Sequence, residues 1–121
     1  MDEATFKART KGLALRTIKL VETLSRGETA RVIGRQLLRS GTSVGANYRA
    51  ACRARSTADM IAKLGIVEEE ADETLYWLEL LVETALMPES RLHALMRETD
   101  EILAMAIASI KTLRARHKRT I

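Results

Sequence analysis

One cysteine, one proline and 3% aromatic residues leave this 121-residue sequence with few groups that cross-link or interrupt a fold. Because Cys52 stands alone, no intramolecular disulfide can form, which is typical of a reducing compartment. No apolar run approaches the roughly 18–20 residues of a membrane-spanning helix. Residues 1–14 include Asp2 and Glu3 and lack the apolar segment of a signal peptide. We therefore expect a cytoplasmic protein with no membrane partner.

The sequence is instead rich in Ala, Leu, Arg, Glu and Met, which are strong helix formers, and it has no strand-type alternation. Apolar residues recur at three- and four-residue steps in four segments. The connections between these segments are short, which forces neighbouring helices to be antiparallel. The pattern predicts an all-α fold, a single up-down-up-down four-helix bundle domain over residues 1–121, with helices at about 2–25, 28–54, 57–86 and 88–116.

Local signals mark the ends of these helices. Asp2 and Ser56 suit N-cap positions, because their side-chain oxygens accept hydrogen bonds from the first turn of a helix. Gly27 suits the stop of the first helix, and Pro88 suits the first turn of the fourth. Beyond Arg116 we expect the chain to fray.

The net charge of +4 is divided unevenly along the chain. Residues 28–55 carry six arginines and one glutamate, whereas residues 56–87 carry one lysine and eight acids. Two interpretations are open. The acidic helix pairs with its basic neighbours, or the basic faces that stay unpaired bind a polyanion.

The arginines of the second helix share one side. At 100° per residue they fall within an arc of roughly 80°, opposite the apolar stripe, provided that the helix continues through Gly41. Arginine suits bidentate phosphate contacts. The alternatives are that this side is solvated or paired with acids, or that it pairs with the acidic helix of a neighbouring subunit. The candidate nucleic-acid-binding residues of this arginine arc are Arg31, Arg35, Arg39, Arg49 and Arg53.

A second basic cluster lies near the end of the chain. It either complements the dipole at the end of a helix or forms a flexible tail that reaches nucleic acid. The further candidate nucleic-acid-binding residues are Arg114, Arg116, Lys118 and Arg119.

Small residues form a stripe on the second helix. Gly34, Gly41, Gly45 and Cys52 project to one side. Glycine inside a helix costs about 0.5–1 kcal/mol relative to alanine. The stripe therefore predicts the close approach of another helix, with Cys52 as a packed apolar side chain rather than a nucleophile.

Polar residues flank the apolar stripe of the same helix and need hydrogen-bond partners. We expect Glu70 or Glu73 of the third helix to supply the acceptors, and a small-molecule site is the alternative. These polar residues are Gln36, Ser40, Ser43 and Asn47.

The third helix has apolar residues off its core stripe. Ile66, Tyr76 and Leu80, with Trp77 beside them, would face water in an isolated bundle. A helix that is apolar on two sides is usually buried on two sides, so these residues predict an oligomer interface. The two aromatic residues are its expected anchors.

Nothing in the sequence indicates catalysis, a metal or another cofactor. A bundle di-iron site needs Glu-x-x-His pairs on facing helices, and neither His93 nor His117 follows a glutamate by three residues. We interpret the acidic run of the third helix as a solvated or ion-paired face. It comprises Glu68, Glu69, Glu70, Asp72 and Glu73.

Two runs carry a family resemblance. They are Gln36-Leu-Leu-Arg-Ser-Gly-Thr-Ser-Val-Gly-Ala-Asn-Tyr-Arg-Ala50 and Glu70-Ala-Asp-Glu-Thr-Leu-Tyr-Trp-Leu-Glu-Leu-Leu81, with Lys63-Leu64 between them. They resemble the bacterial four helix bundle protein family, also named for proteins encoded in intervening sequences of 23S rRNA genes. That family is similar to the accessory variability determinant of diversity-generating retroelements. The resemblance implies a homopentamer of four-helix bundles around a central channel, without known catalytic activity. The retroelement relatives imply binding to nucleic acid.

The sequence thus favours a non-enzymatic, homo-oligomeric bundle that binds RNA or DNA through a basic helix face. The alternative is a structural or adaptor scaffold for a protein partner, without direct contact to nucleic acid. An enzyme or metal protein would require a bound metal, for which the sequence offers no ligand pattern.

Overall fold

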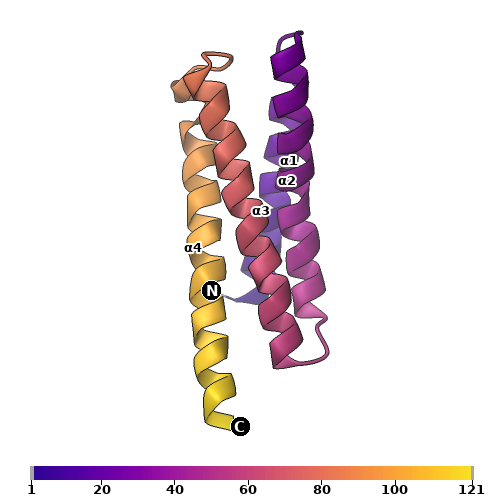
Figure 1. The fold of residues 1–121 in the computed structure, drawn as a ribbon, viewed down its shortest axis with the longest axis vertical. Helices are drawn as coiled ribbons and strands as arrows, with labels where there is room; N and C mark the ends of the chain where they lie inside the picture. The colour runs from indigo at the N-terminus through magenta and orange to yellow at the C-terminus, as the bar shows by residue number, and fades with distance from the viewer. Residues whose placement is uncertain (1, 121) are drawn as a thin grey trace.

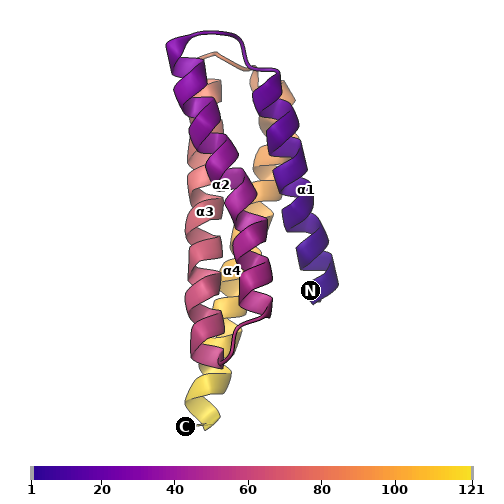
Figure 2. The same ribbon diagram turned by 90° about the vertical axis from the view of Figure 1, so that its right-hand side faces the viewer.

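The computed structural model describes residues 2–120, and these residues form four helices and no strand. The helices lie side by side along one long axis, and the chain reverses direction at every connection (Figures 1 and 2). The prediction of an all-α, four-helix fold is confirmed. The helices are α1 (Glu3–Glu22), α2 (Glu28–Cys52), α3 (Thr57–Glu83) and α4 (Glu89–Thr120).

Two of the predicted caps are confirmed. The Asp2 carboxylate accepts a hydrogen bond from the Thr5 backbone N–H at 2.7 Å, and the Ser56 hydroxyl accepts one from the Asp59 N–H at 3.0 Å. Gly27 does not end the first helix as predicted. It is the N-cap of α2, with a φ of 146° that suits glycine, and α1 ends earlier, at Glu22.

The end of α4 also differs from the prediction. The expected fraying after Arg116 is not seen, because α4 remains helical to Thr120. Residues 111–119 contain neither glycine nor proline, and the basic side chains of the last turn complement the negative end of the helix dipole. Both features let the helix continue beyond the rest of the bundle.

The core lies between the helices and takes side chains from each of them. Each fully buried leucine or isoleucine contributes about 1.5–3 kcal/mol relative to the exposed side chain. The most completely buried large apolar residues include Leu13, Leu37, Leu64, Leu78, Leu81, Leu92 and Ile102. No helix within residues 2–120 combines the length and the apolar character that crossing a bilayer requires.

Helices that follow one another in sequence pack against one another, so α1 and α3 lie diagonally across the bundle. The seam between α1 and α4 is the least extensive of the four. Arg9 of α1 bridges it, donating hydrogen bonds to Glu98 through Nε at 2.9 Å and to Glu101 through Nη2 at 2.9 Å. Helix α1 therefore packs mainly against α2.

The glycine stripe forms the seam between α1 and α2. A Cβ at Gly41 would lie 2.7 Å from Cγ2 of Thr17, and a Cβ at Gly45 would lie 3.2 Å from the backbone oxygen of Thr10. At Gly34 a Cβ would lie 3.1 Å from Cδ1 of Leu24, which follows α1, and 3.5 Å from Cγ1 of Val21 in α1. The predicted close approach of another helix is confirmed.

We predict that Gly41→Ala lowers the free energy of unfolding by about 1–3 kcal/mol, because the added methyl group overpacks the seam against Thr17. Urea denaturation followed by circular dichroism measures the change. The matched control is Gly65→Ala in α3, where an added Cβ would meet nothing within 4 Å. It should gain about 0.5–1 kcal/mol from helix propensity. Equal stabilisation by both substitutions would contradict the close seam.

Candidate nucleic-acid interface

The arginine arc depends on an unbroken second helix, and α2 runs from Glu28 to Cys52 straight through Gly41. Arg53 is the C-cap residue that follows. The five arginines of the arc are all exposed. The five arginines nevertheless differ in their ion-pair partners.

Arg39 is neutralised by the acidic helix of its own chain. Its guanidinium lies 3.1 Å from a carboxylate oxygen of Glu70 and 2.5 Å from one of Glu73. Glu73 also accepts a hydrogen bond from the Trp77 indole at 3.2 Å. The hydrogen bond from Arg39 lowers the pKa of Glu73 and correspondingly raises the pKa of Arg39. Arg39 therefore belongs to the seam between α2 and α3.

The other arginines of the arc form no ion pair with α3 among the described residues. Arg31 pairs with Glu28 in the first turn of its own helix. Arg35, Arg49 and Arg53 have no ion-pair partner within residues 2–120. These three are called the open arginines below. All three are exposed, two of them on α2 and the third at the residue that follows it.

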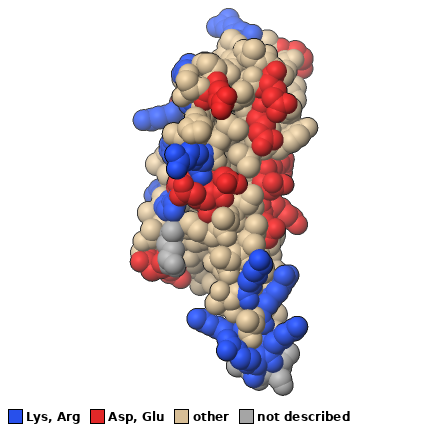
Figure 3. Space-filling view, turned by 90° about the vertical axis from the view of Figure 1, so that its left-hand side faces the viewer, with Lys and Arg blue, Asp and Glu red and all other residues tan. Residues whose placement is uncertain are grey.

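The basic cluster near the end of the chain sits on a helix rather than on a flexible tail. Figure 3 shows Lys and Arg side chains gathered over the last turns of α4, while acidic side chains line an edge farther up the bundle. Arg114, Lys118 and Arg119 are exposed and form no ion pair with any residue that the structure describes. Arg116 is exposed as well and engages other residues of the chain.

The polar residues of α2 bond mostly within their own helix. Ser43 and Asn47 each donate to the carbonyl oxygen four residues earlier, at 2.6 and 2.8 Å. The buried Ser40 accepts a hydrogen bond from Thr74 of α3 at 3.0 Å. The predicted carboxylate acceptors are wrong for these three residues, because both carboxylates face Arg39 instead.

The predicted interface residues of α3 divide into two pairs. Ile66 and Tyr76 are 41% and 53% exposed, whereas Trp77 and Leu80 are half-buried and pack against the core. The Tyr76 and Trp77 rings meet edge to face, with their centroids 5.1 Å apart. Ile66 and Tyr76 thus remain as exposed apolar side chains on the outside of α3.

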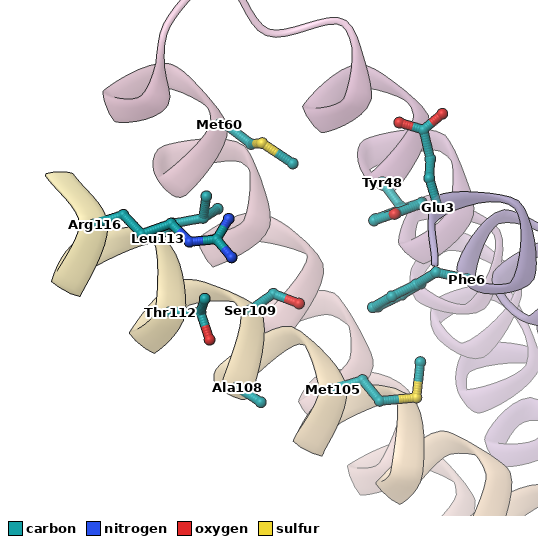
Figure 4. Close-up of a pocket in the computed structure, with 10 residues that line it drawn as sticks. All are labelled: Glu3, Phe6, Tyr48, Met60, Met105, Ala108, Ser109, Thr112, Leu113 and Arg116. Atoms are coloured by element: carbon teal, nitrogen blue, oxygen red, sulfur yellow. The ribbon is translucent and has the colours of Figure 1, made fainter. Parts of the chain in front are cut away.

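A cleft of about 500 Å³ opens where α1 begins and α4 extends past it. Figure 4 shows Glu3 and Arg116 on opposite sides of this cleft, with the Phe6 ring pointing into it. Phe6 stacks on Tyr48 with ring centroids 4.1 Å apart. Met60 and Met105 add flexible apolar walls.

Cys52 behaves as a packed side chain. It is half-buried against the core, and burial raises the pKa of its thiol, which disfavours the reactive thiolate. Burial likewise raises the pKa of the neighbouring Tyr48 phenol. Within residues 2–120, no three side chains among His, Cys, Asp and Glu come together in a way that could hold a metal ion.

A second cleft, between α1 and α2, was missed from the sequence. It is lined by Lys7 and Lys11 together with Arg49. The two lysines are one helical turn apart, which is the one signal that the sequence contains. Their meeting with an arginine of α2 depends on how the two helices are paired, and local patterns do not determine that pairing.

Fold and surface together define a four-helix bundle with a basic outer side on α2 and a basic end on α4. The chain belongs to the 23S rRNA-intervening sequence protein family, whose family model matches residues 3–108. It is also similar to the crystal structure of a protein of unknown function from the S23 ribosomal protein family of Bacteroides thetaiotaomicron. The two are 39% identical with a TM-score of 0.85, over 92% of this chain and 99% of that chain. No curated protein matches the chain significantly. The resemblance inferred from the sequence is confirmed.

We predict that Glu73→Gln lowers the free energy of unfolding at pH 7 by about 0.5 kcal/mol, a magnitude typical of a partly exposed ion pair. Because Arg39 lowers the pKa of Glu73 below its ordinary 4.5, the pair contributes fully above that value. Its contribution is lost as the pH falls through the lowered pKa.

Denaturation series at several pH values should therefore show the wild-type and Glu73→Gln proteins converging in acid. The control is Glu69→Gln, an exposed acid on the same helix without an ion-pair partner among the described residues. A stability difference between wild type and Glu73→Gln that stayed constant below pH 4.5 would contradict the role of this carboxylate.

Proposed function

We propose that this chain is a non-enzymatic, cytoplasmic protein whose antiparallel up-down-up-down bundles assemble with copies of themselves and bind RNA or DNA. The open arginines of α2 and the basic end of α4 make the contacts. The observation that carries the proposal is the division of the arginine arc. Arg39 is paired with carboxylates of α3, whereas Arg35, Arg49 and Arg53 have no ion-pair partner among residues 2–120.

Uncompensated guanidinium groups suit the phosphate backbone of nucleic acid. Arginine makes bidentate contacts to phosphate, and each phosphate that it neutralises releases counterions, which drives binding. Contacts to phosphate groups carry no information about base sequence, so the expected binding is independent of sequence. The family name refers to an intervening sequence of 23S rRNA, which makes RNA the first polyanion to test.

We predict that the triple variant Arg35→Gln/Arg49→Gln/Arg53→Gln loses most of its affinity for single-stranded RNA in a low-salt filter-binding assay. The slope of log K against log salt should fall in magnitude by about 2, because three phosphate contacts are lost at roughly 0.7 each. The control is Arg16→Gln/Arg91→Gln/Arg97→Gln, which removes the same charge from exposed residues of α1 and α4.

Two outcomes would count against this function. Absence of RNA and DNA retention by the wild-type protein at low salt would leave the scaffold for a protein partner as the remaining candidate. Equal losses in the two triple variants would show that only total charge matters. The open arginines would then have no special role.

The assembly part of the proposal, a homopentamer, rests on the exposed apolar side chains of α3. Ile66 and Tyr76 expose apolar surface on a helix that carries several exposed acids. Contact with another subunit would bury this apolar surface. The family resemblance supplies the expected number of subunits.

We predict that light scattering gives wild-type protein the mass of five 13.5-kDa protomers and that Tyr76→Glu gives a smaller species. The added charge would be buried unpaired in the interface. The control is Leu15→Glu, since Leu15 is 56% exposed on α1, diagonally across the bundle from α3. A monomeric wild type, or a pentameric Tyr76→Glu variant, would refute the proposed assembly.

A further inference from the structure

The cleft between α1 and α2 has a volume of about 470 Å³ and is basic on both sides. Lys7 and Lys11 of α1 flank one side and Arg49 of α2 flanks the other. The floor is made of small residues, among them Ala14 and Gly45. Cations from two different helices therefore face a single groove.

Among residues 2–120, none of the residues that line this cleft is acidic. Lys11 and Arg49 have no ion-pair partner in the described part of the chain. Lys7 lies 3.3 Å from Glu3, and the two side chains are 42% and 59% exposed, so this pair is weak and open to exchange with another anion. The cleft thus concentrates positive charge, and among residues 2–120 only Lys7 has an ion-pair partner.

The groove is narrow because the helices approach closely at its floor. At Gly45 the α2 backbone lies so close to α1 that a Cβ added there would be 3.2 Å from the Thr10 carbonyl oxygen. Lys7 and Lys11 are four residues apart, or about 6 Å along the helix axis. This geometry suits an extended chain of anions that lies across the helices, with Arg49 on its opposite side.

The hydroxyl groups at the cleft narrow the class of ligand. Thr10 donates its hydrogen to the Phe6 carbonyl oxygen at 3.0 Å, and Thr42 donates to the Leu38 carbonyl oxygen at 2.7 Å. Both hydrogens are used, so only the cationic side chains remain to bind an anion. Sites for small molecules place several fixed polar groups around one shape, whereas mobile cations suit a repeating phosphate chain.

We propose that this cleft binds phosphate groups of one sugar–phosphate strand, held by Lys7, Lys11 and Arg49. The inference rests on the proposed function and extends it, because two lysines of α1 join an open arginine of α2. The strand crosses from α1 to α2 over the glycine seam. Recognition is by charge and is independent of base sequence.

The test measures fluorescence anisotropy of a labelled single-stranded RNA oligonucleotide with the full-length protein. Lys7→Gln/Lys11→Gln should weaken binding at least about fivefold and reduce the magnitude of the salt slope by about 1.4, or roughly 0.7 per lost contact. The matched control, Arg16→Gln/Lys19→Gln, removes two charges from another side of the same helix. Its affinity should stay within about twofold of wild type because these residues lie outside the cleft.

A charge-neutral variant distinguishes RNA binding in the cleft from an effect of the overall net charge. Ala46→Trp fills the groove, since Ala46 lines it and is exposed, so RNA binding should weaken while circular dichroism and the net charge stay unchanged. If wild type binds RNA, and both Lys7→Gln/Lys11→Gln and Ala46→Trp behave like the control, the cleft proposal is overturned and the proposed function stands.

A second ligand distinguishes a failure of the proposed function from a failure of the cleft proposal. If wild type binds neither RNA nor DNA at low salt, the proposed function falls, and inorganic polyphosphate then tests the cleft alone. Binding of polyphosphate that is lost in Lys7→Gln/Lys11→Gln supports the phosphate cleft. Absence of polyphosphate binding, or equal binding by the double variant and its control, overturns it.

Discussion

The contact between Gly41 of α2 and Thr17 of α1 sets how close the first two helices come, and the surface depends on that distance. A Cβ at Gly41 would overlap the threonine side chain, so a larger residue would push α1 outward. Farther along the same seam, Gly45 holds the backbones together beneath Lys11 and Arg49. Close packing and the basic cleft are thus two consequences of one glycine stripe.

The acidic helix α3 organises the charge of α2. It lies against one side of α2 and neutralises Arg39 through two carboxylates, but it does not reach the arginines that lie farther round the helix. The net charge of +4 therefore understates the local positive charge. A small net charge and a strongly basic face coexist because the acids are concentrated on one helix. That separation also leaves the exposed Tyr76 among acids, away from the basic cleft.

The sequence could predict the number and type of the helices, the caps at Asp2 and Ser56, and the glycine seam. Each of these depends on residues that lie close together in sequence. The partner of Arg39 depends on the register between α2 and α3, so periodicity could only offer pairing with acids as one alternative. Lys7 and Lys11 were missed for the same reason, since their relation to Arg49 is set by how two helices are paired. Which side of a helix faces outward is a local property; which residues of two helices meet is not.

Chemical labelling of arginine by phenylglyoxal, read residue by residue with mass spectrometry in the absence and presence of RNA, tests the central claim most directly. In the proposed function, α3 removes Arg39 from the RNA-binding surface and leaves the open arginines available. Arg49 and Arg53 should react readily in the free protein and be protected by RNA, while Arg39 should react slowly in both states. Protection of Arg39 to the same degree as Arg49, or no protection of any open arginine, would contradict the account.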